Sequence, residues 1–412
     1  MKILNFGSLN LDKVYSVPHI TGPGETNRAA RLNLFPGGKG LNQSIALARA
    51  GVQVFHAGCI GADGEELRTL LTENGVDTRY LKTVPGRTGH AVIQVDDAGQ
   101  NAIFVLPGSN ASVTPEQIRS VLSDFSPGDL LLLQNEISCL PELVELAFAR
   151  GLRVYLNPSP FNEVIGKLNL SHISCLILNE VEAAAFVGTR DIGRFFAFMK
   201  EYYPHLAIML TLGEQGCIYR QEGKGYRHPA FAVRAVDTTA AGDTFTGYFV
   251  AAVSRGQSPQ EALALASAAA ALAVTQPGAA ASIPTRDKVF AALQTLPSRS
   301  VDKPDRAVFL RQYIRENPAT ASINDLSEKL HYSPRYTGKW VRVVTGESFT
   351  TLLGRTRCEL AAYELANTDR PVHEIIADMG YQNEGHFRKM FFAVYHKTPL
   401  AYRKAEQSKK NK

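Results

Sequence analysis

The first 297 residues alternate short apolar runs with amphipathic stretches, and this alternation limits the possible folds more than any other feature. Six runs are apolar enough for buried strands: residues 3–6, 52–57, 130–133, 154–156, 175–178 and 207–211. Helical patterns follow several of them, as in residues 40–50 and 141–150. This order predicts an α/β fold in which helices sandwich a mostly parallel sheet. Ligands of such folds bind beyond the carboxyl ends of the strands.

The alternation stops near residue 300. Two prolines and several polar residues fill positions 296–304, and we interpret residues 298–305 as a linker. After it, only short helical patterns remain. A chain of 412 residues is long enough for two domains, which we place at residues 1–297 and 306–408.

Positive charge is concentrated in the second part. Residues 301–412 carry 19 basic and 13 acidic side chains, whereas the whole chain carries 44 and 39. This asymmetry favours a domain that binds nucleic acid. Charge alone would equally fit an ordinary solvated surface.

The five cysteines are scattered and form no C-x-x-C pair, which is typical of reduced thiols rather than disulfides or a zinc site. No apolar run reaches the roughly 18–20 residues of a membrane span. The amino-terminal segment becomes polar too early for a secretory signal. We therefore expect a cytoplasmic protein without a membrane partner.

Two polar clusters near the amino terminus suggest a sugar site. Asn10 and Asp12 follow the first strand, where their side chains could hold paired hydroxyls. The segment 36–43, Pro-Gly-Gly-Lys-Gly-Leu-Asn-Gln, precedes a helix and differs from the Walker pattern of P-loops. By itself, such a glycine turn is more often a structural helix cap than a ligand site.

A third cluster, residues 236–245, ends a strand and opens a helix predicted from about residue 245 to 255. Its small residues would expose backbone N–H groups at the positive end of that helix, which suits a transferring phosphoryl group. Asp243 could accept a proton from an attacking hydroxyl. Alternatively, Asp243 could simply cap the helix.

Together these clusters resemble the ribokinase branch of the PfkB carbohydrate kinase family over residues 1–295. The likeness includes residues 23–26, 37–43, 179–182, 211–216 and 237–245. It implies a ribokinase-like fold with a small β lid around residues 89–105, through which a homodimer would form. It also implies transfer of phosphate from MgATP to a pentose 5-hydroxyl. Ribose is the expected sugar, and deoxyribose or another furanose stays open, since one lost hydroxyl contact could change the preference.

The resemblance assigns a role to each matching position. Asp243 would be the general base, and the backbone of Ala240, Ala241 and Gly242 would form the anion hole. The sugar would be held by Asn10, Asp12, Gly38, Lys39, Asn42 and Glu136. Magnesium and the ATP phosphates would be organised by Asn179 and Glu182, and the nucleotide would lie against Thr211, Gly213 and Gly216. A potassium ion would be held by Asp237, Thr239, Ala273, Gly278 and Ser282.

The second part of the chain repeats itself. Ile323, Leu326, Leu330 and Tyr332 recur 49 positions later as Val372, Ile375, Met379 and Tyr381. Each copy contains a short helical pattern, a turn and a second pattern with basic residues, which predicts two helix-turn-helix units. A long helix is expected between them over residues 349–366, with Leu352, Leu360 and Leu365 buried. One such unit alone would also fit a helical protein-interaction bundle.

This tandem resembles the AraC-type DNA-binding domain over about the last 100 residues, on the pattern 375–403 that ends in Thr-Pro-x-x-Tyr-Arg. Each second helix would enter a major groove of double-stranded DNA, one turn (~10 bp) apart. The positions facing DNA would be Arg335, Gly338, Lys339 and Arg342, then Glu384, Gly385, His386, Arg388 and Lys389.

Four positions depart from the AraC-type pattern. Thr337 replaces an apolar residue, Gly338 lies inside a helix, Val341 replaces a larger aromatic residue, and His396 replaces a glycine. We therefore expect the first helix-turn-helix unit to be less tightly packed. Trp340, the only tryptophan, is expected to pack inward.

The leading hypothesis is a bifunctional protein, an ATP-dependent pentose kinase fused to a transcriptional regulator. Ligand occupancy of the kinase would then change DNA binding. One alternative is a regulator whose kinase fold senses sugar or nucleotide without turnover, although sensing needs no catalytic base. Another is a metabolic kinase with a helical appendage that binds protein.

Overall fold

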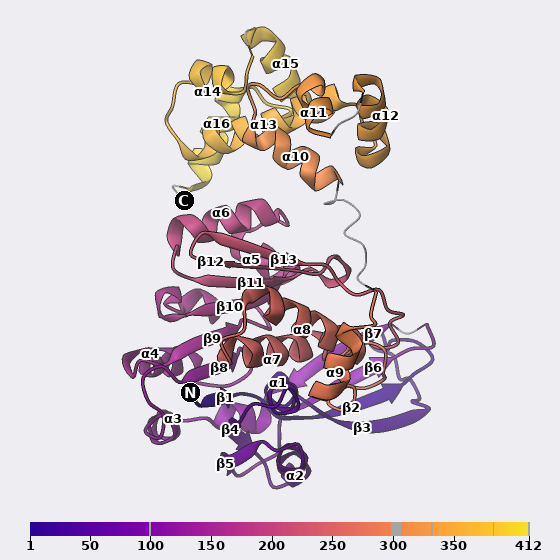
Figure 1. Cartoon of the computed structure of the whole chain (residues 1–412), viewed down its shortest axis with the longest axis vertical. Helices are drawn as coiled ribbons and strands as arrows, with labels where there is room; N and C mark the ends of the chain where they lie inside the picture. The colour runs from indigo at the N-terminus through magenta and orange to yellow at the C-terminus, as the bar shows by residue number, and fades with distance from the viewer. Residues whose placement is uncertain (99, 298–305, 331–332, 382, 411–412) are drawn as a thin grey trace. The chain divides into compact units, whose positions relative to one another are not determined.

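The computed structural model describes residues 1–98, 100–297, 306–330, 333–381 and 383–410. The chain forms two compact units, residues 1–300 and 301–412, each described by itself (Figure 1). The predicted linker, residues 298–305, lies outside the described residues. No helix in the described part of the chain is long and apolar enough to cross a membrane.

The first unit is built on a nine-stranded sheet with the order β13-β12-β11-β10-β9-β8-β1-β4-β5. Its strands are β1 (Ile3–Phe6), β4 (Val54–Ile60), β5 (Asp77–Thr83), β8 (Leu130–Gln134), β9 (Arg153–Asn157), β10 (Cys175–Asn179), β11 (Ala207–Thr211), β12 (Cys217–Gln221) and β13 (Lys224–His228). In this sheet β11, β10, β9, β8, β1, β4 and β5 pair in parallel with their neighbours. Strand β12 is antiparallel to β11, and β13 is antiparallel to β12. The expected mostly parallel sheet is confirmed.

Helices cover both faces of this sheet (Figure 1). One face packs against α1 (Lys39–Arg49), α2 (Glu65–Glu73), α7 (Ala241–Ser254), α8 (Pro259–Ala273) and α9 (Arg286–Leu293). The other packs against α3 (Pro115–Leu122), α4 (Leu140–Ala149), α5 (Glu180–Val187) and α6 (Ile192–Tyr202). The leucines of β8 alternate between these two cores, which explains why a parallel strand is an unbroken apolar run.

A separate four-stranded sheet, the lid, has the order β3-β2-β6-β7. It consists of β2 (Asn10–Ser16), β3 (Arg31–Gly37), β6 (His90–Val95) and β7 (Asn101–Leu106). The lid expected around residues 89–105 therefore also includes two strands from the amino-terminal region. Those strands escaped the sequence analysis because their side chains are mostly half-buried or exposed and leave no apolar run.

The second unit is entirely helical in its described residues. Its helices are α10 (Arg306–Glu316), α11 (Ile323–Leu330), α12 (Pro334–Thr345), α13 (Phe349–Asn367), α14 (Val372–Asp378), α15 (Glu384–Tyr395) and α16 (Pro399–Lys410). Two small cores share α13: Phe349 and Leu352 belong to one, and Cys358 and Leu365 to the other. The expected long helix is therefore confirmed, with Leu360 only partly buried.

Candidate functional site

A polar cavity of about 230 Å³ lies where β9, β10 and β11 end and where α1 and α7 begin. The predicted site residues that line it are Lys39, Asn179, Glu182, Thr211, Ala240, Gly242 and Asp243. Residues far apart in the sequence thus meet beyond the carboxyl ends of parallel strands, as expected for this fold class.

The Asp243 carboxylate is buried in the first turn of α7 and is held by two side-chain amides. Asn42 Nδ2 donates to Asp243 Oδ2 at 3.0 Å, and Gln43 Nε2 donates to Oδ1 at 2.9 Å. Asp243 does not cap its helix, because α7 begins four residues earlier than expected and Ala240 occupies the cap position. This geometry leaves the carboxylate facing the cavity.

The start of α7 offers backbone N–H groups to the same cavity. Ala240 adopts a left-handed conformation with a φ of 58°, which turns the chain into the helix. The amide of Ala241 donates to Thr238 O at 3.3 Å, while those of Gly242 and Asp243 have no acceptor among the described residues. Free amides at a helix start are a favourable environment for an anion.

Lys39 provides positive charge beside these groups. Asp243 raises the pKa of the Lys39 ammonium, against the opposing effect of burial, so this side chain stays charged. The Lys39 amide donates to Glu136 Oε2 at 3.1 Å, and Ser8 Oγ donates to the same oxygen. Burial raises the pKa of Glu136, although Lys39 counteracts part of the effect.

Asn10 and Asp12 lie at the start of β2 in the lid. Asn10 Oδ1 accepts a hydrogen bond from Asn110 Nδ2 at 2.8 Å. Asp12 Oδ1 is buried without a partner among the described residues, and burial raises the pKa of this carboxyl to about 6. A Cβ at Gly37 would lie 2.0 Å from Asp12 Oδ2, so a larger residue there would displace the Asp12 side chain. An unpartnered carboxylate oxygen of this kind is suited to accept ligand hydroxyls.

Asn179 and Glu182 form a capping box at the start of α5. The Asn179 side chain accepts the amides of Val181 and Glu182, and Glu182 Oε2 accepts the Asn179 amide at 3.0 Å. Glu182 keeps a second carboxylate oxygen for other contacts. Thr211 lines the cavity as expected, whereas Gly213 and Gly216 lie in the turn after β11 and do not line it.

The loop before α7 is tied to the segment after α8 through Asp237. Its carboxylate accepts the amides of Thr239 at 2.8 Å and Gly278 at 2.9 Å. Burial alone would raise the pKa of Asp237, but these hydrogen bonds lower it overall. Three of the five predicted potassium ligands are thus connected, while the Ser282 hydroxyl donates to Ala279 O and Ala273 lies at the end of α8.

Metal binding by side chains alone has little support in this unit. No group of three or more His, Cys, Asp or Glu that could hold a metal occurs in the described part of the chain. Magnesium usually keeps several waters and uses one or two carboxylates plus substrate phosphates. Glu182 and Asn179 fit that smaller contribution.

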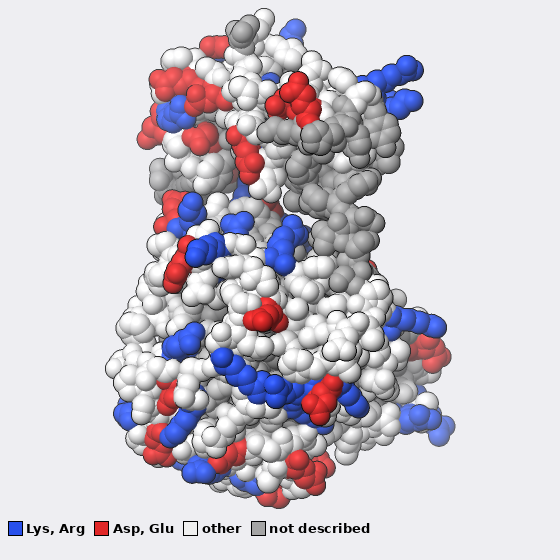
Figure 2. Space-filling model, viewed as in Figure 1, with Lys and Arg blue, Asp and Glu red and all other residues white. Residues whose placement is uncertain are grey.

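The nine predicted DNA-facing positions all lie in α12 and α15. In α12, Arg335, Lys339 and Arg342 are exposed, and Lys and Arg side chains project from the surface over this helix (Figure 2). In α15, Arg388 pairs with Glu384 at 2.9 Å. Asp and Glu side chains gather over neighbouring α14, where Arg370 pairs with Asp378 at 2.6 Å (Figure 2). Among the described residues, the first helix-turn-helix unit therefore presents more positive charge without a carboxylate partner than the second.

Three of the four departures from the AraC-type pattern, at Thr337, Val341 and His396, have defined surroundings in the structure. Thr337 is fully buried, and its hydroxyl accepts from Ser327 Oγ at 2.9 Å and donates to Ser333 O at 3.1 Å. This polar pair replaces the usual apolar contact with its hydrogen bonds satisfied. Trp340 is 8% exposed and Val341 is buried in the same core, so the inward packing of Trp340 is confirmed. His396 ends α15 with a φ of 52°, a left-handed conformation that favours glycine.

Comparison with known proteins decides the family. A model of the pfkB family carbohydrate kinases matches residues 1–286. The chain belongs to the PfkB family of carbohydrate kinases. A helix-turn-helix domain model matches residues 326–405 and corresponds to the AraC-type tandem. The protein therefore consists of an ATP-dependent sugar kinase domain fused to an AraC-type helix-turn-helix domain.

Relatives of the kinase domain are closely similar. The ribokinase of Haemophilus influenzae is 37% identical over 297 residues, covering 70% of this chain and 97% of the relative. The ribokinase of Cryptococcus neoformans in complex with ADP has a TM-score of 0.63 at 34% identity, covering 70% of this chain and 99% of that one. The Arabidopsis thaliana ribokinase complexed with ribose and ATP has a TM-score of 0.63 at 28% identity, with coverages of 71% and 98%.

Sequence reasoning missed several polar side chains that support the kinase site. Gln43 belongs to the segment 36–43, but the motif alone does not predict its hydrogen bond to Asp243. Asn110 holds Asn10 from 100 residues away, and Ser8 contacts Glu136 across 128 residues. No local pattern marks Asn110 or Ser8, since only the folded sheet brings them to the site.

Proposed function

We propose that the kinase domain transfers the γ-phosphate of ATP to the 5-hydroxyl of a pentose, with ribose as the first candidate. The observation that carries this proposal is the buried Asp243 carboxylate, held by Asn42 and Gln43 beside the free amides of α7. Phosphoryl transfer needs little beyond positioning, charge stabilisation and a base. The similarity to ribokinases supports ribose and ATP as substrates.

In this mechanism, Asp243 accepts the proton of the attacking hydroxyl. The amides of Gly242 and Asp243, with those of Ala240 and Ala241 as further candidates, stabilise negative charge on the transferring group. Lys39 adds a positive charge on the same side. Asn10, Asp12, Gly38, Asn42 and Glu136 hold the sugar hydroxyls and so direct one of them toward the base.

Magnesium and potassium belong to this proposal as ions that the residues present would accommodate. Glu182 and Asn179 would hold magnesium together with the ATP phosphates, where it would neutralise phosphate charge. Asp237 and Thr239 before α7, together with Ala273, Gly278 and Ser282 at and after the end of α8, would hold potassium next to the anion hole. Chelation of magnesium is expected to slow turnover, and so is exchange of potassium for sodium.

The decisive experiment is ATP-dependent phosphorylation of a panel of pentoses by the purified chain. Ribose should be turned over, and Asp243→Ala should lower kcat by about 10²–10⁴-fold because the base is lost. Asp191→Ala, which removes the cap of α6, should leave kcat unchanged. Sugar binding without turnover would instead favour the alternative in which the kinase fold acts only as a sensor.

We propose that the second unit binds double-stranded DNA through α12 and α15, and that the protein is a transcriptional regulator. The duplicated helix pairs and the exposed basic residues of α12 support this role. Two recognition helices would enter successive major grooves about 10 bp apart. A cytoplasmic location stays a prediction.

We propose further that two copies of the chain associate through the lid. Seven large apolar side chains on its two outer strands are 44–62% exposed: Leu32, Leu34, Phe35, Ile103, Phe104, Val105 and Leu106. Apolar surface concentrated on sheet-edge strands is typical of an interface. A homodimer would cover it, and sedimentation of a Leu34→Glu variant as a monomer would support that assembly.

A further inference from the structure

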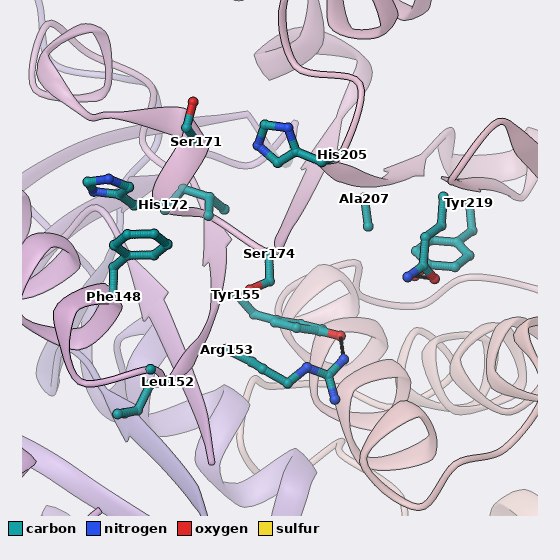
Figure 3. Close-up of a pocket in the computed structure, with 13 residues that line it drawn as sticks. Phe148, Leu152, Arg153, Tyr155, Ser171, His172, Ser174, His205, Ala207 and Tyr219 are labelled. Atoms are coloured by element: carbon teal, nitrogen blue, oxygen red, sulfur yellow. Dashed lines mark hydrogen bonds between the residues drawn. The ribbon is translucent and has the colours of Figure 1, made fainter. Parts of the chain in front are cut away.

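A second hollow of about 390 Å³ opens at the amino-terminal ends of β9, β10 and β11, opposite the ends that line the catalytic cavity (Figure 3). Strand β10 begins at Cys175 beside this hollow and ends at Asn179 in the catalytic cavity. Strand β11 likewise connects Ala207 to Thr211. Strand β9 likewise runs from Arg153 to Asn157, so the hollow is distinct from the kinase site but shares three strands with it.

An unneutralised positive charge lines this hollow. Arg153 is half-buried, and its guanidinium donates to the Tyr155 hydroxyl at 2.8 Å. No carboxylate among the described residues forms an ion pair with Arg153. Burial raises the pKa of Tyr155, so the hydroxyl stays neutral and does not balance the charge. A partly desolvated cation of this kind favours an anionic ligand.

Additional hydrogen-bond donors face the same space. The side chains of Ser171, Ser174 and His205 have no hydrogen bond within the described part of the chain, and Ser174 lies between His205 and the Arg153–Tyr155 pair in Figure 3. His172 is different, because Glu145 and Asn169 occupy its two ring nitrogens and its ring stacks on Phe148 at 3.8 Å. His172 therefore forms a wall of the hollow rather than a ligand contact.

We propose that this hollow binds a small phosphate-bearing polyol, such as a pentose phosphate. Arg153, Ser174 and His205 would hold the phosphate, since a guanidinium and hydroxyls match phosphate oxygens. The buried rings of Tyr155 and Tyr219 also line the hollow and would pack against a short carbon chain. The volume is at the lower end of small-molecule pockets, which span roughly 300–1,000 Å³. Inorganic phosphate carries the same charged group and is the alternative ligand for this site.

The test is calorimetric titration of the full chain with ribose 5-phosphate while excess ribose and a non-hydrolysable ATP analogue occupy the catalytic cavity. We expect one further molecule to bind per chain. Arg153→Gln should weaken this binding about tenfold or more, because a charge-assisted hydrogen bond is lost. His205→Ala, on an exposed loop, should weaken it about threefold and guards against misfolding of the Arg153 variant.

Lys82→Gln is the matched control, because it removes one exposed positive charge on β5 at the far edge of the sheet. It should bind like the wild type. Equal affinity for inorganic phosphate would identify the free ion as the ligand and still support a phosphate site. Absence of binding, or the same affinity in Arg153→Gln and wild type, would overturn the proposal. This readout needs no turnover, so it can fail while the kinase proposal holds, and the reverse is also true.

Discussion

At the scale of single residues, Gln43 is one of the two side chains that hold the Asp243 carboxylate in place. Its Nε2 donates to Asp243 and, at 3.1 Å, to Asn157, while its Oε1 accepts from Gln134 at 2.7 Å. The network continues through Asn5 to Ser44 and the buried His56. Gln43 is thus a positioning residue whose two ends are both fixed.

We predict that Gln43→Met lowers kcat by about 10–100-fold, since a hydrogen bond to a charged group contributes roughly 1.5–3 kcal/mol. The KM for the sugar should change little, because Gln43 would not contact it. Steady-state kinetics separates the two parameters. Gln117→Met is the control: Gln117 is equally buried and hydrogen-bonded, to Gly58 O at 3.0 Å, but remote from Asp243. A normal kcat in Gln43→Met would contradict the positioning role.

Asp12 gives a prediction about pH. Burial raises the pKa of its carboxyl from 3.8 to about 6, and Glu136 adds to the shift. The ionised form accepts hydrogen bonds from sugar hydroxyls, whereas the protonated form loses part of this capacity. The KM for the sugar should therefore be constant well above pH 6 and should rise as the pH falls through that value. Measured KM–pH profiles test this.

The control for the pH prediction is Asp12→Asn, which should raise the KM at neutral pH and abolish its pH dependence near 6. If the step persists in that variant, it belongs to another group, and Glu136 is the obvious candidate because burial also raises its pKa.

At the scale of secondary-structure elements, the two recognition helices differ in available charge. Arg335 in α12 is exposed with no carboxylate bound to it among the described residues, whereas Arg388 in α15 is paired with Glu384 at 2.9 Å. The helices occupy equivalent places in the repeat. We therefore expect α12 to provide more of the phosphate contacts, although its sequence departs further from the AraC-type pattern.

This asymmetry predicts different salt dependences. For a mixed-sequence duplex, Arg335→Ala should reduce the slope of log K against log salt by about 0.9, the value of one phosphate contact, and Arg388→Ala should change it less. Fluorescence anisotropy over a salt series measures both slopes. A larger change in Arg388→Ala would mean that Arg388 leaves Glu384 to contact DNA first.

Elements with continuous or strictly periodic apolar patterns were predictable, and elements without them were not. Strands β1 and β11 have the expected bounds because each is buried on both faces. The first turn of α7 consists of small residues without apolar periodicity, so the sequence predicts the start of this helix four residues too late. The same limit applies to the site: Lys39 and Asp243 come from motifs, whereas Asn110 and Arg153 acquire their surroundings only from distant strands.

At the scale of the whole molecule, the chain joins a carbohydrate kinase domain to a helix-turn-helix domain. Covalent attachment by itself couples nothing. Coupling requires that sugar or nucleotide bind more tightly to one of two arrangements that differ in DNA affinity. Allosteric coupling is typically 1–3 kcal/mol, or about 5–150-fold in affinity.

We predict that ribose together with a non-hydrolysable ATP analogue changes the dissociation constant for DNA by a factor in that range. Linkage requires that saturating DNA change the dissociation constant for ribose by the same factor, so the two titrations check each other. Asn10→Ala should lose the effect of ribose while keeping the affinity for DNA in its absence, because Asn10 lies in the kinase unit and not in α12 or α15. Identical DNA affinities with and without both ligands would show that the domains act independently. The chain would then carry two activities that do not influence each other.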